Sequence, residues 1–93
     1  MIVGTLAIRL VIPEARSLKQ KRSALKSVKD RLRNDFNISV SEIDNHDVWQ
    51  SATIGVAMVG GDTQHVNAVL SKVIEAVKRF HQVQLVDYEL EMY

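Results

Sequence analysis

Apolar and polar residues alternate along four stretches of the chain, and apolar residues recur at helical spacing along two others. Alternation predicts a β-strand, and recurrence every three or four residues predicts an amphipathic α-helix. Pro13 ends the first strand because proline cannot donate to a sheet. The expected strands are residues 2–12, 37–44, 49–59 and 83–93, and the last should turn Val86, Tyr88, Leu90 and Met92 toward the core.

Both predicted helices have recognisable starts. Ser17 followed by Gln20 fits a capping box, in which the serine oxygen accepts a backbone N–H and the glutamine side chain reaches back. That helix should end between residues 34 and 37. The second helix should begin at Asp62 or Thr63, and its apolar stripe extends to Phe80.

The order of elements is therefore strand, helix, strand, strand, helix, strand. With right-handed crossovers, this βαββαβ order gives a four-stranded antiparallel sheet with two helices on one face, the ferredoxin-like arrangement of the α+β class. A second core would need roughly another hundred residues. We therefore expect residues 1–93 to form a single domain.

Composition narrows the class of protein. With 46% apolar and 25% charged residues, the chain fits a globular rather than a disordered protein. The absence of cysteine removes disulfides, thiol catalysis and cysteine-based zinc sites. Residues 1–13 are mostly apolar, but this stretch contains Arg9 and is shorter than the ~20 residues that a helix needs to cross a bilayer. We expect a soluble cytoplasmic protein that does not contact the membrane.

The net charge is only +1, but basic residues are concentrated in one segment. Residues 17–34 hold seven of the twelve Lys and Arg residues against one acid, Asp30, so this segment carries +6 and the rest of the chain −5. On a helical projection, five of the seven occupy an arc of about 80° beside the apolar arc. These five are called the basic ridge here: Lys19, Arg22, Lys26, Lys29 and Arg33.

Two interpretations of the basic ridge stay open. Lys and Arg in a row along a helix can contact consecutive phosphates of a nucleic acid. Alternatively, Lys and Arg are good helix formers, and the ridge is only the solvated side of the helix. The scarcity of acids favours the first interpretation, because a merely solvated helix usually has glutamates that pair with Lys four residues away.

Lys21 falls inside the apolar arc of the same helix and therefore needs an anionic partner. The strand over residues 37–44 runs back beside the helix, where six strand residues at ~3.3 Å match about fourteen helical residues at ~1.5 Å. Glu42 then comes level with Lys21 and Arg22. We predict a structural ion pair from Glu42 to one of these two residues beneath the helix.

Three segments resemble one family pattern: LKQKR at 18–22, RLRNDFNISVSE at 31–42 and WQ at 49–50. In this order and spacing they are similar to the YlxP-like family of small uncharacterised bacterial proteins. Members usually have Glu where this chain has Gln20, and often His where it has Arg16. The resemblance implies a ferredoxin-like fold and supplies no catalytic residues. The family's genes tend to lie among those for translation initiation and ribosome maturation, which implies RNA or the ribosome as a partner by association.

The sheet face without helices should be flat, because its side chains are small or apolar. Such a face either stays exposed or meets a partner, so self-association as a homodimer is a second hypothesis. RNA-binding sheets of this topology stack bases on aromatic residues of their central strands, where this chain offers only Trp49, at the end of a strand. We therefore do not expect the sheet face to read bases by stacking. Arg9 should pair with Asp87 or Glu89 on this face.

No catalytic or metal site is predicted. Asp44, His46 and Asp47 are better explained as turn formers than as metal ligands. Acylphosphatases share the predicted topology, and such an enzyme has a glycine-rich phosphate cradle between the first strand and the first helix. Here that loop is IPEARS, residues 12–17, which contains no glycine. We expect no enzymatic activity, no cofactor and no small-molecule substrate.

The first functional hypothesis is a non-enzymatic cytoplasmic protein that binds RNA or the ribosome through the basic ridge. The alternative is a homodimeric protein-interaction module that uses the open sheet face and binds no nucleic acid. The salt dependence of binding distinguishes the two hypotheses. The affinity for phosphates falls steeply as the salt concentration rises, whereas association through a sheet face hardly changes with salt. A small-ligand regulatory domain is a third class, for which the sequence shows no pocket.

Overall fold

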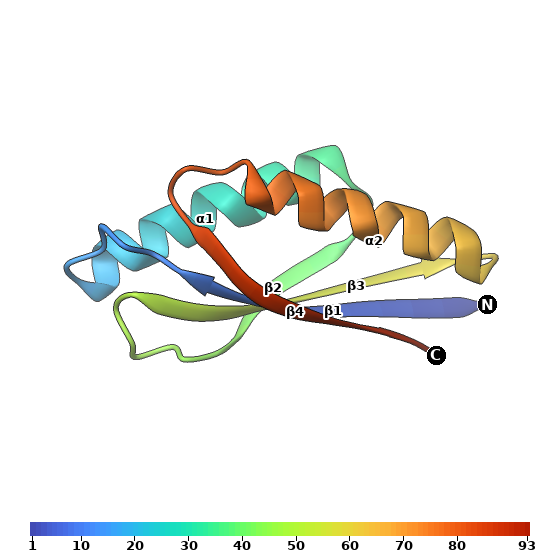
Figure 1. Ribbon diagram of the computed structural model, residues 1–93, viewed down its shortest axis with the longest axis horizontal. Coiled ribbons are helices and arrows are strands. Elements are labelled where there is room, and N and C mark those ends of the chain that lie inside the picture. Colours follow the sequence, from blue (N-terminus) through green and yellow to red (C-terminus); the bar gives the residue numbers. More distant parts are fainter.

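The computed structural model describes all 93 residues and has the βαββαβ order that the sequence predicts. The sheet is antiparallel, with strand order β2-β3-β1-β4. Both helices lie on one face of it and the other face carries none, so the fold is ferredoxin-like and of the α+β class (Figure 1). The elements are β1 (Ile2–Val11), α1 (Leu18–Asp35), β2 (Ser39–Asp44), β3 (Ser51–Gly60), α2 (Thr63–Lys78) and β4 (Gln84–Met92).

Both helices begin at a side-chain cap, which explains why the chain leaves the extended conformation there. Ser17 Oγ accepts the backbone N–H of Gln20 at 3.1 Å, and Asp62 Oδ1 accepts that of His65 at 2.8 Å. The Gln20 side chain reaches back as predicted, but it accepts the N–H of Arg16 rather than that of Ser17. Between Asp62 and Thr63, the structure selects Asp62 as the cap of α2.

One hydrophobic core lies between the helices and the sheet. Twenty buried apolar side chains form it, with Leu6, Ile8 and Leu10 of β1 at its centre. Helix α2 packs closely against β1 at Gly4. A Cβ atom at that position would overlap Val66 and lie 2.8 Å from Leu70 Cδ1, so the absence of a side chain at Gly4 sets the distance between α2 and the sheet.

Edge strand β4 differs from its prediction. The sequence predicts that Val86 and Tyr88 point inward, yet both are exposed. The register between β1 and β4 shifts between Arg9 and Leu10: Arg9 pairs with Asp87, but Leu10 pairs with Leu85. Val86 is therefore left without a partner in β1, as in a β-bulge. Leu90 and Met92 do pack against the core. Alternation alone does not reveal a bulge or the limited width of the helical layer above an edge strand.

The hairpin between β2 and β3 is longer than predicted, because β3 begins at Ser51 rather than at Trp49. Residues 45–50 therefore form a loop. Asn45 adopts a left-handed conformation with φ of 64°, and its N–H is accepted by the Asp44 carboxylate at 2.8 Å. Neither helix has the length and hydropathy that crossing a membrane requires.

Candidate functional site

Helix α1 holds the basic ridge on the side away from the core. Its buried side chains are Lys21, Leu25, Val28 and Leu32. Four members of the basic ridge are exposed and Lys29 is partly buried. At ~1.5 Å per residue, Lys19 and Arg33 stand about 21 Å apart along the helix axis. The ridge is thus a basic strip that extends along most of α1.

Side-chain contacts show which flank of α1 this strip occupies. Arg33 Nη2 donates to the Val40 carbonyl oxygen at 2.6 Å, which places the strip beside edge strand β2. On the opposite flank the Arg31 guanidinium lies 4.8 Å from the centre of the Phe80 ring, just beyond α2. The basic ridge therefore faces away from α2 and borders the free edge of the sheet.

Asp30 neutralises part of the basic ridge. Its carboxylate lies 2.7 Å from Lys26 Nζ and 3.7 Å from Arg33 Nη1. This aspartate fills the role that glutamates four residues from a lysine have on a solvated helix, so α1 is less purely basic than its scarcity of glutamates predicts. Lys19, Arg22 and Lys29 form no ion pair in the structure. These three charges remain available for an anionic partner.

The pairing of Asp30 makes a pH-dependent contribution to stability. The hydrogen bond from Lys26, with attraction from Lys26, Arg33 and Lys29, holds the pKa of the Asp30 carboxyl below its ordinary value. A lowered pKa in the folded state stabilises the fold above the ordinary carboxyl pKa, and acid removes this contribution as Asp30 becomes protonated. We expect the pKa of Asp30, followed by NMR, to rise in Lys26→Gln and with added salt. An unchanged pKa in that variant would show that the pairing is absent in solution.

The predicted ion pair beneath α1 forms between Glu42 and Lys21, and not with Arg22. Lys21 Nζ lies 2.9 Å from Glu42 Oε2, and the two side chains are 1% and 14% exposed. The same ammonium group donates to the Asn45 carbonyl oxygen at 2.5 Å. Glu42 Oε2 has no aligned hydrogen bond, so the Glu42 contact is electrostatic and the Asn45 contact is the directional one. Lys21 thus joins α1 to β2 and to the following loop.

Gln50 holds the other end of the same loop. Its side-chain amide donates to the backbone carbonyl oxygens of Pro13 and Ala15 at 3.3 and 3.1 Å. The backbone carbonyl oxygen of Gln50 accepts the N–H of Ile12 at 2.8 Å. The loop of residues 45–50 is therefore fixed to the β1–α1 connection, at the end of the molecule where α1 begins (Figure 1). In the sequence Gln50 stands out only as part of the family pattern, because nothing in its spacing reveals these bonds.

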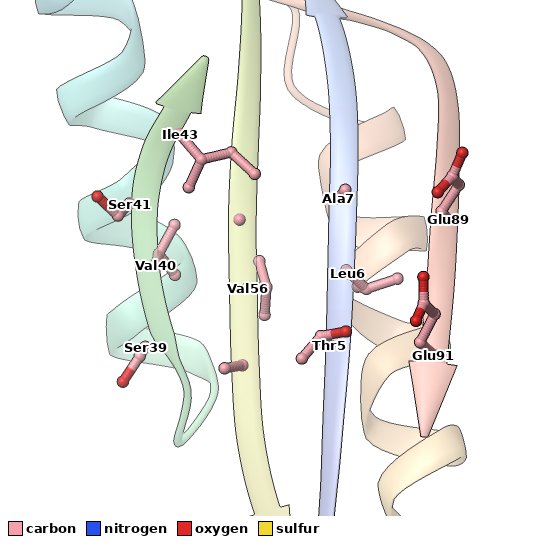
Figure 2. A pocket seen from close by; sticks show the side chains of 12 residues that line it. Thr5, Leu6, Ala7, Ser39, Val40, Ser41, Ile43, Val56, Glu89 and Glu91 are labelled. Atoms are coloured by element: carbon pink, nitrogen blue, oxygen red, sulfur yellow. The ribbon is translucent and has the colours of Figure 1, made fainter. Parts of the chain in front are cut away.

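The open face of the sheet is hollowed into a shallow groove of about 410 Å³. Figure 2 shows the groove with Ile43 of β2 leaning across β3 on one side, and Glu89 and Glu91 of β4 on the other. Ile43 is in contact range of Gly55, where a Cβ atom would lie 2.8 Å from Ile43 Cγ2. Small side chains of β1 and β3 form the floor: Thr5, Ala7 and Ala57. The groove is thus apolar with an acidic rim.

Arg9 on this face pairs with Asp87 of the neighbouring strand. Its guanidinium contacts both carboxylate oxygens of Asp87, and this hydrogen bonding holds the pKa of the Asp87 carboxyl below its ordinary value. The Tyr93 hydroxyl donates to Glu91 at 2.5 Å. Nowhere in the structure do three His, Asp or Glu side chains gather as a metal site would require, and this includes Asp44, His46 and Asp47.

Comparison with known proteins gives a family and a fold. The chain is similar to the uncharacterized protein YlxP of Bacillus subtilis (strain 168), with 32% identity over 83 residues, 89% of this chain and 90% of the relative. Among solved structures it is similar to the de novo designed protein Foldit4, with a TM-score of 0.55, 10% sequence identity, and coverage of 100% of this chain and 97% of that one. At that identity the likeness concerns the fold alone. The model of a family described as "Protein of unknown function (DUF503)" matches residues 3–90, so the chain belongs to this family, as its YlxP-like segments predict.

Proposed function

We propose that this protein is a non-enzymatic cytoplasmic binding protein that associates with RNA, including ribosomal RNA, through the basic ridge of α1. The observation that supports the proposal is the uncompensated charge on one flank of that helix. Lys19, Arg22 and Lys29 have no acidic partner, and Asp30 is shared between Lys26 and Arg33. A strip about 21 Å long can meet several successive phosphates.

The contacts that such a strip makes are sequence-independent. Lys and Arg bind phosphate oxygens and carry no information about the base. Two features favour Lys19, Arg22 and Lys29 as the main contributors to the proposed affinity. Arg33 already holds the Val40 carbonyl, and Lys26 must exchange Asp30 for a phosphate. The strip also borders a free sheet edge rather than α2, so no other element covers it.

The groove on the open face supports a second candidate function, a homodimeric protein-interaction module without nucleic-acid binding. An apolar hollow of about 410 Å³ on a face without helices is the kind of surface that a second copy can cover. This candidate predicts a dimer mass in solution that depends little on salt. The RNA hypothesis predicts steep salt dependence.

The deciding experiment measures binding of a structured ribosomal RNA fragment and of a generic single-stranded RNA across a salt series. If all five members of the basic ridge contact phosphates of a single strand, log K should fall against log salt with a slope of about −3.5. The variant Lys19→Glu/Arg22→Glu/Lys29→Glu should lose at least three contacts and bring the slope to about −1.4 or nearer zero. This variant spares Arg33, whose hydrogen bond to Val40 belongs to the fold.

A matched control carries the same change of charge on α2 and just beyond it: Lys72→Glu/Lys78→Glu/Arg79→Glu. All three side chains are exposed, so this protein should fold and bind RNA more strongly than the ridge variant does. Equal losses in both variants would mean that only net charge matters and would remove the ridge from the proposal. Absence of RNA binding at low salt, with a dimer mass by light scattering, would favour the second candidate.

A further inference from the structure

Trp49 is the only tryptophan of the chain, and the core does not use it. The residue is 54% exposed, and it is neither in the hydrophobic core nor among the side chains packed against it. The preceding Val48 is also exposed. About half of Trp49, a large apolar residue, is thus left in water, and covering that surface with a ligand would be favourable. Trp49 is therefore outside the hydrophobic core and accessible to a ligand.

The loop that presents Trp49 is fixed on both sides. At one end the buried Lys21 holds the Asn45 carbonyl, and at the other Gln50 holds the carbonyls of Pro13 and Ala15. Held in this way, Trp49 loses little conformational entropy when a planar ligand stacks on it. The same contacts attach the loop to the start of α1, where Lys19 and Arg22 begin the basic ridge.

We propose that Trp49 is a stacking platform for an unpaired RNA base at the end of the basic ridge, so that the preferred ligand is single-stranded RNA. The inference rests on the proposed function and adds a ligand class to it. Bases of single strands stack on exposed aromatic rings while Lys and Arg track the backbone. A duplex offers its phosphates to the ridge but no free base to Trp49. The aromatic residue lies in a loop and not on the sheet face, so this differs from base stacking across central strands.

The test uses a fluorescently labelled single-stranded RNA of about 12 nucleotides and a duplex of the same sequence, each titrated into the intact protein. Stacking on one base is worth roughly a five- to hundred-fold change in affinity. Trp49→Ala should weaken single-strand binding by that factor and leave duplex binding unchanged, whereas Trp49→Phe should retain most of the affinity. Because Trp49 is the only tryptophan, its intrinsic fluorescence should be quenched by the single strand and not by the duplex.

Tyr93→Ala provides the matched control, because Tyr93 is 68% exposed and follows β4, away from the Trp49 loop. It should leave both affinities unchanged. If the single strand binds through the basic ridge while Trp49→Ala binds as the native chain does and the fluorescence does not move, the stacking proposal is overturned and RNA binding stands. If neither RNA binds the native chain at low salt, the proposed function itself fails.

Discussion

Replacing Lys21 by methionine should lower the free energy of unfolding by roughly 3 kcal/mol, the lower end of the range for breaking a buried ion pair. Methionine fills a similar volume, so the loss comes from charge and not from a cavity. Glu42 would lose its cationic partner at a site where its side chain is only 14% exposed, and the Asn45 carbonyl would lose its donor. For a domain of this size, that is a large share of the 5–15 kcal/mol of total stability. Urea unfolding followed by circular dichroism measures the change.

A neighbouring lysine supplies the control for this prediction. Lys19→Met removes the same charge from the same helix, but Lys19 is exposed and unpaired, so its effect should stay within about 0.5 kcal/mol. Combining Lys21→Met with Glu42→Leu should recover part of the loss, because no carboxylate is then stranded. Equal effects of Lys21→Met and Lys19→Met would disprove the view that the buried ammonium stabilises the fold.

Replacing Gly4 by valine should destabilise the protein by ~1–3 kcal/mol through overpacking. The new Cβ atom would overlap Val66 and lie 2.8 Å from Leu70 Cδ1, so these side chains or α2 itself must move away from β1. The loss should outweigh the better strand propensity of valine, which spans at most ~1 kcal/mol. Thermal unfolding measures the effect, and Gly61→Ala is the control because a Cβ atom there meets nothing within 4 Å.

A compensating pair tests the cause of this loss. Gly4→Ala adds one methyl group, and Val66→Ala removes the side chain that it would strike. We expect the double variant to be more stable than the two single losses together imply, with a coupling of roughly 0.5–3 kcal/mol. Strict additivity would show that backbone entropy at Gly4, and not the fit of α2, determines the cost.

Most of the fold could be predicted because local signals and the global pattern agree. Alternation located the strands, the Ser17 and Asp62 caps located the helix starts, and element order determined the topology. The Lys21–Glu42 pair followed from comparing the rise of a helix with that of a strand. A charged residue in an apolar arc is a strong constraint, because few arrangements can satisfy it.

Other features could not be predicted because they depend on contacts between distant segments. Gln50 donates to carbonyls more than thirty residues earlier in the chain, and no local pattern signals this. Val86 is exposed because the β1–β4 pairing shifts there. The start of β3 at Ser51 depends on a loop whose ends are tied by Lys21 and Gln50. For the candidate site, the sequence located the basic ridge but not the groove, whose shape depends on Ile43 leaning across Gly55.

Opposite charges lie at the two outer edges of the sheet, which gives the molecule an electric dipole. Basic side chains of α1 border β2, while Asp87, Glu89 and Glu91 belong to β4 at the far edge. With a net charge of only +1, a distant polyanion attracts the whole molecule weakly but exerts a torque on it. The molecule should therefore rotate before contact, so that α1 leads and β4 trails. Orientation during diffusion then raises the fraction of productive encounters, an effect on the association rate that fades within a Debye length of about 8 Å at physiological salt.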